Sequence, residues 1–537
     1  MWIRNGIFLL FTLGSISAYT QLFFPNESYY NGQIERFRLR SDSSINHYQT
    51  HLSMKPVMET IALKDSVLFD DSEHYYWITQ KIFKENFIIF TNGDQQNPGD
   101  FWCSIDPILD VEAGADLAED SLRLLYWNTR GIRIQARIMD KVAFTTSVYE
   151  TQSFQPQYYS DYVKAHGEFY PNSSATSYTQ QNGVVPGYAR VKLFKGDGFD
   201  YSMASGVLAI RPNKHFNVSL GQSNHFIGNG HRSLLLSDFS TPYPFVNFRT
   251  TFWKGRIQYN VMYSIHQNLY RLREYSTPEA SYEKKLGAHQ YLDVSVSKNW
   301  QIGLFYGSLW NRVDSSGMVK MNYLYLNPVI LSNAFFNANG PGRSQITGFN
   351  TNVTFGMTSF YSQLVLQEDF SMGGFQFGLT SYDLLTPNLD VQLEYNQVRQ
   401  NTYLSDEDRM NWSSNNLPLA HPLTAGFREL IARISYQHNR FFVTNQLTYS
   451  ARDRNDSYAI GTGILEPKST VLLPPGFYQN HVVMNQIEIG YRFNKQNNLQ
   501  LFMGYTYRNE TFYNDRPTTN YVFAGIRTRL NNKTQNF

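Results

Sequence analysis

Residues 256–266 read Arg-Ile-Gln-Tyr-Asn-Val-Met-Tyr-Ser-Ile-His, and their alternation is the clearest pointer to the fold class. Every second residue is apolar or aromatic, and the residues between them are mostly polar. The first set is Ile257, Tyr259, Val261, Tyr263 and Ile265, and the second is Arg256, Gln258, Asn260, Met262, Ser264 and His266. Because successive side chains of a β-strand point to opposite faces, this stretch predicts a strand with one apolar and one mostly polar face.

The same alternation recurs from about residue 130 onward, and the clearest segments are 389–396, 430–437, 486–493 and 499–507. A soluble β-sandwich also alternates, so one segment decides little. Here, however, the polar sets include Arg433, Glu488 and Arg492. An arginine that faces lipid costs about 2–4 kcal/mol at the bilayer midplane, so these residues must face a wet lumen. Repeated segments of about ten residues with this pattern are typical of a transmembrane β-barrel.

The aromatic content points the same way. The chain has 39 Phe, 38 Tyr and 8 Trp, yet its mean hydropathy is negative. A barrel accommodates both facts, because rings form the lipid-facing band while the lumen stays polar. After the first twenty residues no apolar run approaches the ~18 residues of a membrane-spanning helix. A net charge of +2 gives no indication of nucleic-acid binding, and the single Cys103 cannot form an internal disulfide.

The connections between the expected strands alternate between short and long, as barrel topology requires. Tight turns are expected near 253–255, 297–300, 356–358, 384–388, 438–440 and 494–498, and long connections at 153–186, 268–288, 311–347, 399–427 and 452–482. With the tight turns in the periplasm, the last strand, about 519–530, leaves the C-terminus there, and the terminal Phe537 fits insertion from that end. The sequence predicts an all-β transmembrane antiparallel barrel of about 18 strands. Counts of about 16 to 20 stay open because 87–130 and 222–245 are ambiguous.

The N-terminal segments differ from the rest. Arg4, the apolar run 6–16 and the small residues before Gln21 predict a secretory signal peptide over 1–20. Residues 21–86 are polar and weakly periodic, and we expect a periplasmic segment that partly plugs the barrel. Residues 87–537 form the expected barrel in the outer membrane of a Gram-negative bacterium.

The most unusual stretch is 222–238, which reads Gln-Ser-Asn-His-Phe-Ile-Gly-Asn-Gly-His-Arg-Ser-Leu-Leu-Leu-Ser-Asp. Gly228 and Gly230 allow a positive φ or a close backbone approach. The titratable residues gathered here are His225, His231, Arg232 and Asp238. One interpretation is a lumenal or rim site for an anionic or sugar ligand, with Arg232 as a forked donor. The other, which we favour, is a kinked strand whose polar residues satisfy one another inside the barrel.

Other chemistry finds less support in the sequence. A hydrolase at the barrel rim could use His225, His231 and Ser233, but a sequence cannot show them meeting. No His/Cys cluster has ligand spacing and no loop resembles an EF-hand, so neither a metal nor another cofactor is expected. In 153–186, tyrosines at 158, 159, 162, 170 and 178 suit sugar rings, although the surface loops of an exported barrel are often tyrosine-rich in any case.

Several motifs resemble those of a known family. They are 225–238, which begins His-Phe-Ile-Gly-Asn-Gly-His-Arg, Tyr-Leu-Asn-Pro-Val at 325–329, Glu-Tyr-Asn-Gln-Val-Arg at 394–399, Pro-Leu-Ala-His-Pro-Leu at 418–423 and Gly-Ile-Arg-Thr-Arg-Leu at 525–530. Together they resemble the Bacteroidota outer-membrane proteins called gliding-motility protein RemB, which are distantly similar to the Wzi capsule-assembly barrels. The resemblance implies a non-enzymatic surface role. By analogy the candidate ligand contacts are His225, Arg232, Arg399 and His421, with His231 and Asp238 beside them.

Three functions follow as hypotheses. The first is a surface barrel for gliding motility or adhesion that binds or anchors surface polysaccharide, with membrane lipid and envelope motility or secretion proteins as partners. The second is a channel for sugars or other nutrients. The third is the rim hydrolase.

Overall fold

The computed structural model describes residues 28–40, 52–56, 79, 82, 86–92, 100–119, 122–139, 141–172, 177–271, 282–311, 323–336, 343–453, 460–471, 473, 479–495, 497–513, 515–528, 535 and 537. The predicted signal peptide over 1–20 lies outside these residues, as does most of 21–86. Among the described residues, no helix is both long enough and apolar enough to span a bilayer.

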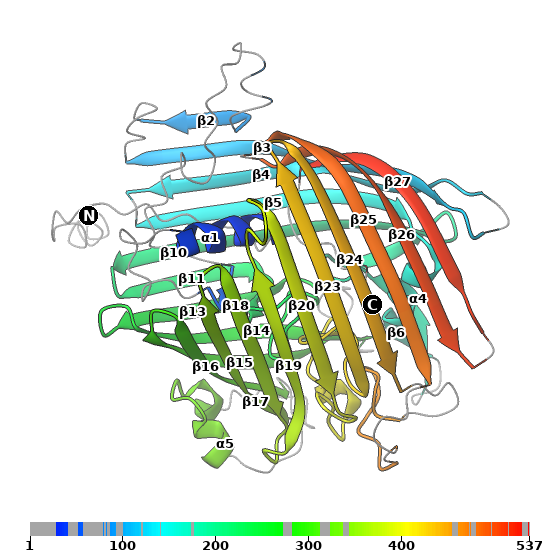
Figure 1. Ribbon diagram of the computed structural model, residues 1–537. Helices are drawn as coiled ribbons and strands as arrows, with labels where there is room; N and C mark the ends of the chain where they lie inside the picture. Colours follow the sequence, from blue (N-terminus) through cyan, green and yellow to red (C-terminus); the bar gives the residue numbers. More distant parts are fainter. Residues whose placement is uncertain are drawn as a thin grey trace, which may run out of the picture.

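Within these ranges eighteen strands form one closed antiparallel barrel (Figure 1). In chain order they are β3 (Phe101–Asp116), β4 (Leu125–Ile138), β5 (Val142–Phe154), β10 (Gly198–Asn213), β11 (Phe216–Ser223), β13 (Tyr243–Phe252), β14 (Ile257–Arg271), β15 (Tyr282–Ser297), β16 (Trp300–Asn311), β17 (Arg343–Phe355), β18 (Thr358–Leu366), β19 (Met372–Ser381), β20 (Leu389–Val398), β23 (Phe427–His438), β24 (Phe441–Arg452), β25 (Asn480–Asn494), β26 (Leu499–Phe512) and β27 (Thr518–Thr528). Each pairs with the next, and β27 closes on β3 in a register that matches Tyr521 with Asp116. The predicted fold class and strand number are confirmed.

Shorter elements complete the described chain. They are α1 (Ser28–Arg40), β1 (Met54–Lys55), β2 (Ile88–Thr91), α4 (Gln157–Ala165), β6 (Glu168–Pro171), β7 (Tyr178–Gln181), β8 (Gly183–Val184), β9 (Arg190–Phe194), β12 (Phe226–Ile227), η3 (Tyr323–Leu326), α5 (Ser332–Phe336), η4 (Asp408–Met410), β21 (Ser413–Ser414) and β22 (Leu417–Pro418). The ambiguous stretch 87–130 therefore holds β2, β3 and the start of β4, whereas most of 222–245 is a connection.

The two faces of the wall differ as the alternation predicts. Large apolar side chains on the outer face are exposed by 36–61%, in a band that suits acyl chains. They include Ile132, Val148, Leu220, Phe248, Ile302, Phe349, Phe360, Phe377, Leu393, Leu430, Ile434, Leu447, Ile489, Leu501, Met503 and Val522. In β14 the inward set Gln258, Asn260, Met262, Ser264 and His266 is buried. Arg433, on the inward face of β23, lies against an inner cavity, as its place in the polar set requires.

The two ends of the barrel also differ. One end carries the tight turns 139–141, 214–215, 253–256, 298–299, 356–357, 382–388, 439–440 and 495–498, and we call it the tight-turn end. At the other end the strands are joined by longer connections, and we call it the long-loop end; the described parts of these connections are 117–119, 122–124, 155–172, 177–197, 224–242, 323–336, 367–371, 399–426, 453, 460–471, 473, 479, 513 and 515–517. The last strand, β27, finishes at the tight-turn end.

The hydrophobic core lies inside the barrel, where several long connections fold inward. Leu234, Leu235 and Leu236 are fully buried there, as are Trp412 and Val163. These side chains come from 224–242, from 399–426 and from α4 in 155–197. Burying their apolar surface against one another is favourable. The lumen is therefore packed like a protein interior where these three connections meet.

Helix α1 and strand β1 lie in the lumen as well (Figure 1). The Arg36 guanidinium lies 2.5 Å from Asp390 at the start of β20 and 3.5 Å from Asp383 in the turn before it, so α1 sits near the tight-turn end. Strand β1 pairs with β12, matching Met54 with Ile227. These contacts favour the expectation that part of 21–86 plugs the barrel, which stays a proposal.

Two strand boundaries and the position of the C-terminal residue differ from the sequence expectation. Arg256 belongs to the turn before β14, because the ladder with β13 begins at Ile257. The connection expected at 268–288 is shorter, since β14 and β15 pair as far as Arg271 and Tyr282. The placement of Phe537 in the periplasm was wrong: its ring packs in the interior against Tyr159 and Tyr162 of α4. Alternation could not reveal this last contact, because it depends on a connection far away in the sequence.

Candidate functional site

The connection between β11 and β13, residues 224–242, folds into the barrel and is called the inner loop. Side chains from the wall hold its backbone in place. The Glu394 carboxylate on β20 accepts the backbone N–H groups of His231 at 2.6 Å and of Arg232 at 3.0 Å. Gln376 on β19 donates to the carbonyl of Arg232 at 3.0 Å. The tip of the inner loop is therefore fixed by the wall through its main chain.

The glycines of the inner loop are needed for this close approach. Gly228 has φ 143°, in a region that L-residues avoid, and a Cβ there would lie 2.3 Å from Nε2 of Gln363. That Gln363 side chain donates to the carbonyl of Ile227 at 2.9 Å and accepts from the N–H of Leu234 at 2.8 Å. At Gly230 a Cβ would lie 2.5 Å from Oε2 of Glu394. The expectation of a positive φ or a close approach at these glycines is confirmed.

A buried charge cluster lies behind the tip. Nη2 of Arg232 lies 3.3 Å from Oε1 of Glu429 on β23, and Nε2 of His421 lies 2.8 Å from the other oxygen of that carboxylate. Asn396 donates to Glu429 at 3.1 Å. The N–H of Leu423 donates to Nδ1 of His421 at 3.2 Å, so the proton of this imidazole sits on Nε2 and points to Glu429. Burial lowers the pKa of His421, and the nearby Glu429 carboxylate opposes this effect.

His421 belongs to a second inward connection, residues 399–426 between β20 and β23, which we call the second inner loop. The two loops bind each other directly. The N–H of Ser237 donates to the carbonyl of Leu419 at 2.7 Å, and the indole N–H of Trp412 donates to the carbonyl of Leu235 at 3.2 Å. Together the loops form a partition across the lumen.

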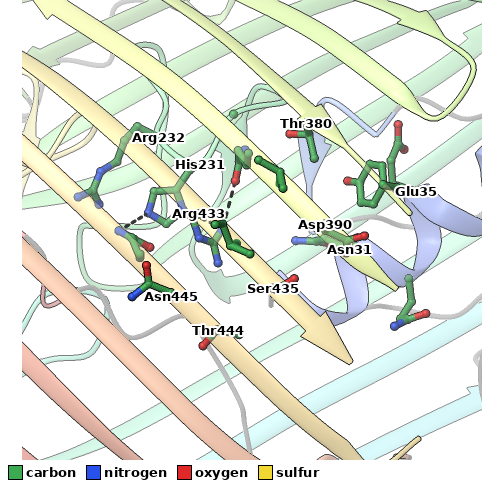
Figure 2. Close-up of a pocket in the computed structure, with 18 of the residues that line it drawn as sticks. Asn31, Glu35, His231, Arg232, Thr380, Asp390, Arg433, Ser435, Thr444 and Asn445 are labelled. Carbon is green, nitrogen blue, oxygen red and sulfur yellow. Dashed lines mark hydrogen bonds between the residues drawn. The ribbon is translucent and has the colours of Figure 1, made fainter. Parts of the chain in front are cut away.

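A cavity of about 400 Å³ lies between this partition and helix α1 (Figure 2). Its wall carries hydroxyl side chains, among them those of Thr380, Ser435 and Thr444. The strand residues among them lie toward the tight-turn ends of β19, β23 and β24, so the cavity occupies that half of the barrel. Its volume lies within the range of about 300–1,000 Å³ that small-molecule pockets have.

His231 faces this cavity and is a neutral imidazole (Figure 2). The Arg433 guanidinium donates to its Nδ1 at 3.2 Å, since arginine has donors only and Nδ1 must therefore accept. Burial lowers the pKa of His231 far below its usual value, and the positive charges of Arg433, Arg232 and Lys55 lower it further. Positive charge therefore gathers at the partition side of the cavity.

Lys55 on β1 also lines the cavity. Its ammonium lies 4.7 Å from the centre of the Phe226 ring, and it makes no hydrogen bond or ion pair to the described residues. Burial lowers its pKa, an effect that the carboxylates of Asp238, Glu35 and Glu394 oppose. An enclosed ammonium without hydrogen-bond acceptors is costly, so this site favours a bound anion or water.

The structure brings together four of the residues predicted from the sequence. His231, Arg232 and Asp238 line the cavity, and His421 lies one layer behind them against Glu429. Arg232 is not the open forked donor of the first sequence interpretation, because Glu429 engages it. The segment is also an inward loop, so the expectation of a kinked strand was wrong, although its polar groups do meet partners inside the barrel.

Two predicted residues lie elsewhere. His225 is buried against the rings of Tyr243 and Phe245, and burial lowers its pKa to about 3. Arg399 is exposed at the end of β20, where its backbone N–H donates to the carbonyl of Gly373 at 2.7 Å. Neither lies among the residues that line the cavity.

Sequence reasoning missed the acidic and amide residues that hold the site. Glu394 and Glu429 organise the inner loop, and Lys55 lies in a segment that showed no clear pattern. Glu394 stood out in the sequence only as a polar position of its strand and as the first residue of the motif 394–399. In the described part of the chain, no three His, Cys, Asp or Glu side chains are grouped so that they could hold a metal ion.

A second cluster lies at the long-loop end, where β6 and β7 meet the end of β14. The rings of Phe169 and Tyr270 stack with centres 4.3 Å apart, Arg271 lies 4.4 Å from the Tyr170 ring, and Arg409 lies 4.5 Å from the Tyr270 ring and 5.7 Å from that of Tyr178. We call Tyr170, Tyr178, Tyr270, Arg271 and Arg409 the rim cluster. All five are partly exposed.

The other predicted tyrosines of 153–186 are placed differently. Tyr159 is buried in the core, and Tyr158 and Tyr162 pack against it. The sequence could not separate the two groups, because all five tyrosines stand in one polar stretch.

No family model matches the chain, and no curated protein sequence matches it significantly. Solved structures do. Wzi of Escherichia coli, an outer-membrane protein involved in group 1 capsule assembly and described as a carbohydrate-binding β-barrel, superposes with a TM-score of 0.53. The match covers 94% of this chain and 98% of Wzi at 12% sequence identity.

The protein is an outer-membrane β-barrel. At this identity the likeness to Wzi shows the fold. A weaker likeness exists to a BenF-like porin of Pseudomonas fluorescens Pf-5, with a TM-score of 0.41 and 9% sequence identity over 80% of this chain and 99% of the porin. Another exists to OccAB2 of Acinetobacter baumannii, with a TM-score of 0.41 and 10% sequence identity over 79% of this chain and 96% of OccAB2.

Proposed function

We propose that this barrel binds or anchors surface polysaccharide at its long-loop end, outside the cell, and thereby serves gliding motility or adhesion. The rim cluster is the observation that carries this proposal. It combines aromatic faces with donors at a partly exposed place, and sugar rings offer apolar C–H patches and hydroxyls together.

The charges of the rim cluster favour an uncharged or weakly charged sugar at this place. Arg271 lies 2.9 Å from Glu168, and Arg409 is paired with Glu283. Because each guanidinium already has a carboxylate partner, ring stacking and hydrogen bonding should dominate recognition there.

Two resemblances support the surface role. The sequence motifs are similar to those of the RemB-type gliding-motility proteins, and the fold is similar to Wzi, whose description names carbohydrate binding. Envelope motility or secretion proteins are the partners that this role requires.

The direct experiment measures binding of the host's extracted surface polysaccharide to the purified barrel in detergent. Tyr178→Ala and Tyr270→Ala should each weaken binding about tenfold, the size expected when a central aromatic contact is lost. Tyr513→Ala is the matched control, since Tyr513 is an exposed tyrosine in another connection at the same end. Equal loss in all three variants, or no binding by the unaltered protein, would count against the proposal. Colony spreading of the same variants tests the motility part.

A second ligand contact is proposed for the cavity, on the strength of Lys55. A ligand site in the lumen beside His231, Arg232 and Asp238 would suit a small carboxylated sugar. Its carboxylate would contact Lys55 and Arg433. Calorimetry with glucuronate, and with glucose as the uncharged probe, tests this contact. Lys55→Gln should abolish a preference for glucuronate, while Arg40→Gln, which removes a positive charge that does not line the cavity, should not.

The alternative functions find less support in the geometry. The partition obstructs the described lumen, which disfavours a channel. A rim hydrolase would need the Ser233 hydroxyl to donate to a histidine, but in the structure this hydroxyl donates to the carbonyl of Ile227 at 2.5 Å. Ser264, which does contact His266 at 2.8 Å and His289 at 3.0 Å, is buried in the lumen wall and away from the rim.

A further inference from the structure

The connection 312–342 behaves unlike the inner loops. Its described part, residues 323–336, holds η3 and α5 and lies on the outside of the barrel wall beside β14–β16 (Figure 1). Tyr325 stacks on Trp310 of β16 with ring centres 4.7 Å apart. We call residues 325–334 the outer flap.

The outer flap is tied to the wall by side chains that face outward. The Tyr263 hydroxyl donates to the carbonyl of Leu326 at 2.6 Å, and Nε2 of Gln290 donates to the carbonyl of Asn327 at 2.7 Å. The Tyr259 hydroxyl donates to the carbonyl of Pro328. Tyr259 and Tyr263 belong to the apolar face of β14 that sequence reasoning assigned to lipid. In the structure they hold a segment of the chain instead.

The flap lies at the depth of the lipid-facing band. Gln290 on β15 pairs in register with Val261 on β14, and Val261 pairs with Phe248 on β13. Phe248 is one of the exposed apolar residues of the outer band. On this row the flap covers the wall, because Gln290 and Val261 point outward and are nevertheless buried.

Non-helical backbone in a bilayer is tolerated only where its polar groups are satisfied. Several backbone groups of the flap meet this condition. Beyond the carbonyls bound by the wall, the N–H of Val329 donates to the side-chain oxygen of Asn327 at 3.0 Å. The N–H groups of Ser332 and Ala334 donate to the carbonyls of Val329 and Leu331 at 3.2 and 3.0 Å. Its most exposed described side chain is apolar, with Val329 exposed by 61%.

We propose that the outer flap is embedded in the membrane, where Val329 and its neighbours contact lipid acyl chains directly. The wall side chains Tyr259, Tyr263 and Gln290 satisfy its backbone in place of water. The occupant of the flap's outer surface is therefore lipid, and this conclusion does not depend on the polysaccharide proposal.

Spin labelling tests the placement. In a Cys103→Ser background, Val329→Cys carries a nitroxide in protein reconstituted into phosphatidylcholine vesicles. Accessibility to oxygen, which concentrates in lipid, is compared with accessibility to a water-soluble nickel chelate. Phe377→Cys marks the lipid-facing wall, and Tyr513→Cys marks an exposed position at the long-loop end.

A label at 329 should match position 377, with high oxygen and low nickel accessibility. A label that matches position 513 would overturn the proposal, and so would a label shielded from both reagents, which would indicate protein on the flap. The double variant Tyr263→Phe/Gln290→Leu removes two hydrogen bonds to the flap and should raise the mobility of the 329 label. Tyr505→Phe, which removes a hydrogen bond between an outward tyrosine and Asn520 elsewhere on the wall, should leave the mobility unchanged. Equal mobility in the two variants would also contradict the proposal.

Discussion

Arg232 and Glu429 form an ion pair in the interior of the barrel, with Nη2 and Oε1 3.3 Å apart and side chains exposed by 5% and 0%. The pair joins the inner loop to β23, and His421 of the second inner loop shares the same carboxylate. One carboxylate from the wall thus secures both loops of the partition.

Glu429→Gln should destabilise the protein strongly, because it removes the carboxylate charge that pairs with the buried Arg232 guanidinium. Loss of one partner of a buried pair typically costs about 3–5 kcal/mol. The measurement is urea unfolding in detergent, followed by tryptophan fluorescence. Asp197→Asn, which breaks an exposed pair with Lys164, should cost at most about 1 kcal/mol. Adding Arg232→Met to Glu429→Gln should recover part of the loss, and a double variant no more stable than the single one would contradict this account.

Gly228→Ala should destabilise the inner loop, since φ 143° is strained for alanine and the new Cβ would meet Gln363 at 2.3 Å. The strain alone is worth roughly 1–3 kcal/mol. The same unfolding measurement applies. Gly32→Ala in α1 is the control, because nothing lies within 4 Å of its Cβ position and alanine favours a helix. Equal stability of the two variants would contradict the assigned role of Gly228.

Asp453, just after β24, should make stability depend on pH. Burial raises its pKa from 3.8 to about 7, so the folded state holds the proton more tightly than the unfolded state. The stability that protonated Asp453 contributes is fully present below about pH 4 and is lost as pH rises through about 7. Asp453→Asn should therefore be more stable than the unaltered protein at pH 8.5 and little different at pH 4. The temperature at which the folded band disappears in electrophoresis, measured on samples equilibrated at each pH, checks this. A gain that is equal at both values would refute the assignment to Asp453.

The partition should keep the barrel closed to ions. In planar bilayers the unaltered protein should show no steady conductance, whereas replacing residues 228–239 with a short Gly-Ser linker should produce open channels. Arg36→Gln, which loosens α1 but leaves the partition in place, should stay closed. Steady conductance by the unaltered protein would instead favour the channel alternative.

The barrel itself could be predicted from the sequence because alternation is a local property. Leu430 and Arg433 reveal opposite faces of β23 through spacing alone, and the structure confirms both. The predicted number of strands was close for the same reason, and it stayed open only because the pattern was ambiguous in 87–130 and in 222–245.

The candidate site was less accessible to sequence reasoning. His231, Arg232 and Asp238 stood out because they are close in the chain, but Glu394 and Glu429 lie 162 and 197 residues beyond Arg232. Their meeting depends on the closure of the whole ring of strands.

The sequence alone determined the class of fold, which face of each strand is apolar and which face is polar and charged. It could do so because every second side chain of a strand lies in the same environment. Only the tertiary structure decided which connections fold inward as a partition, that Phe537 returns to the interior, and that Tyr259 and Tyr263 hold an outer flap. The physical reason is that these outcomes depend on hydrogen bonds and packing between segments far apart in the chain, such as Gln363 with Leu234 or Gln290 with Asn327. No local period encodes such pairs.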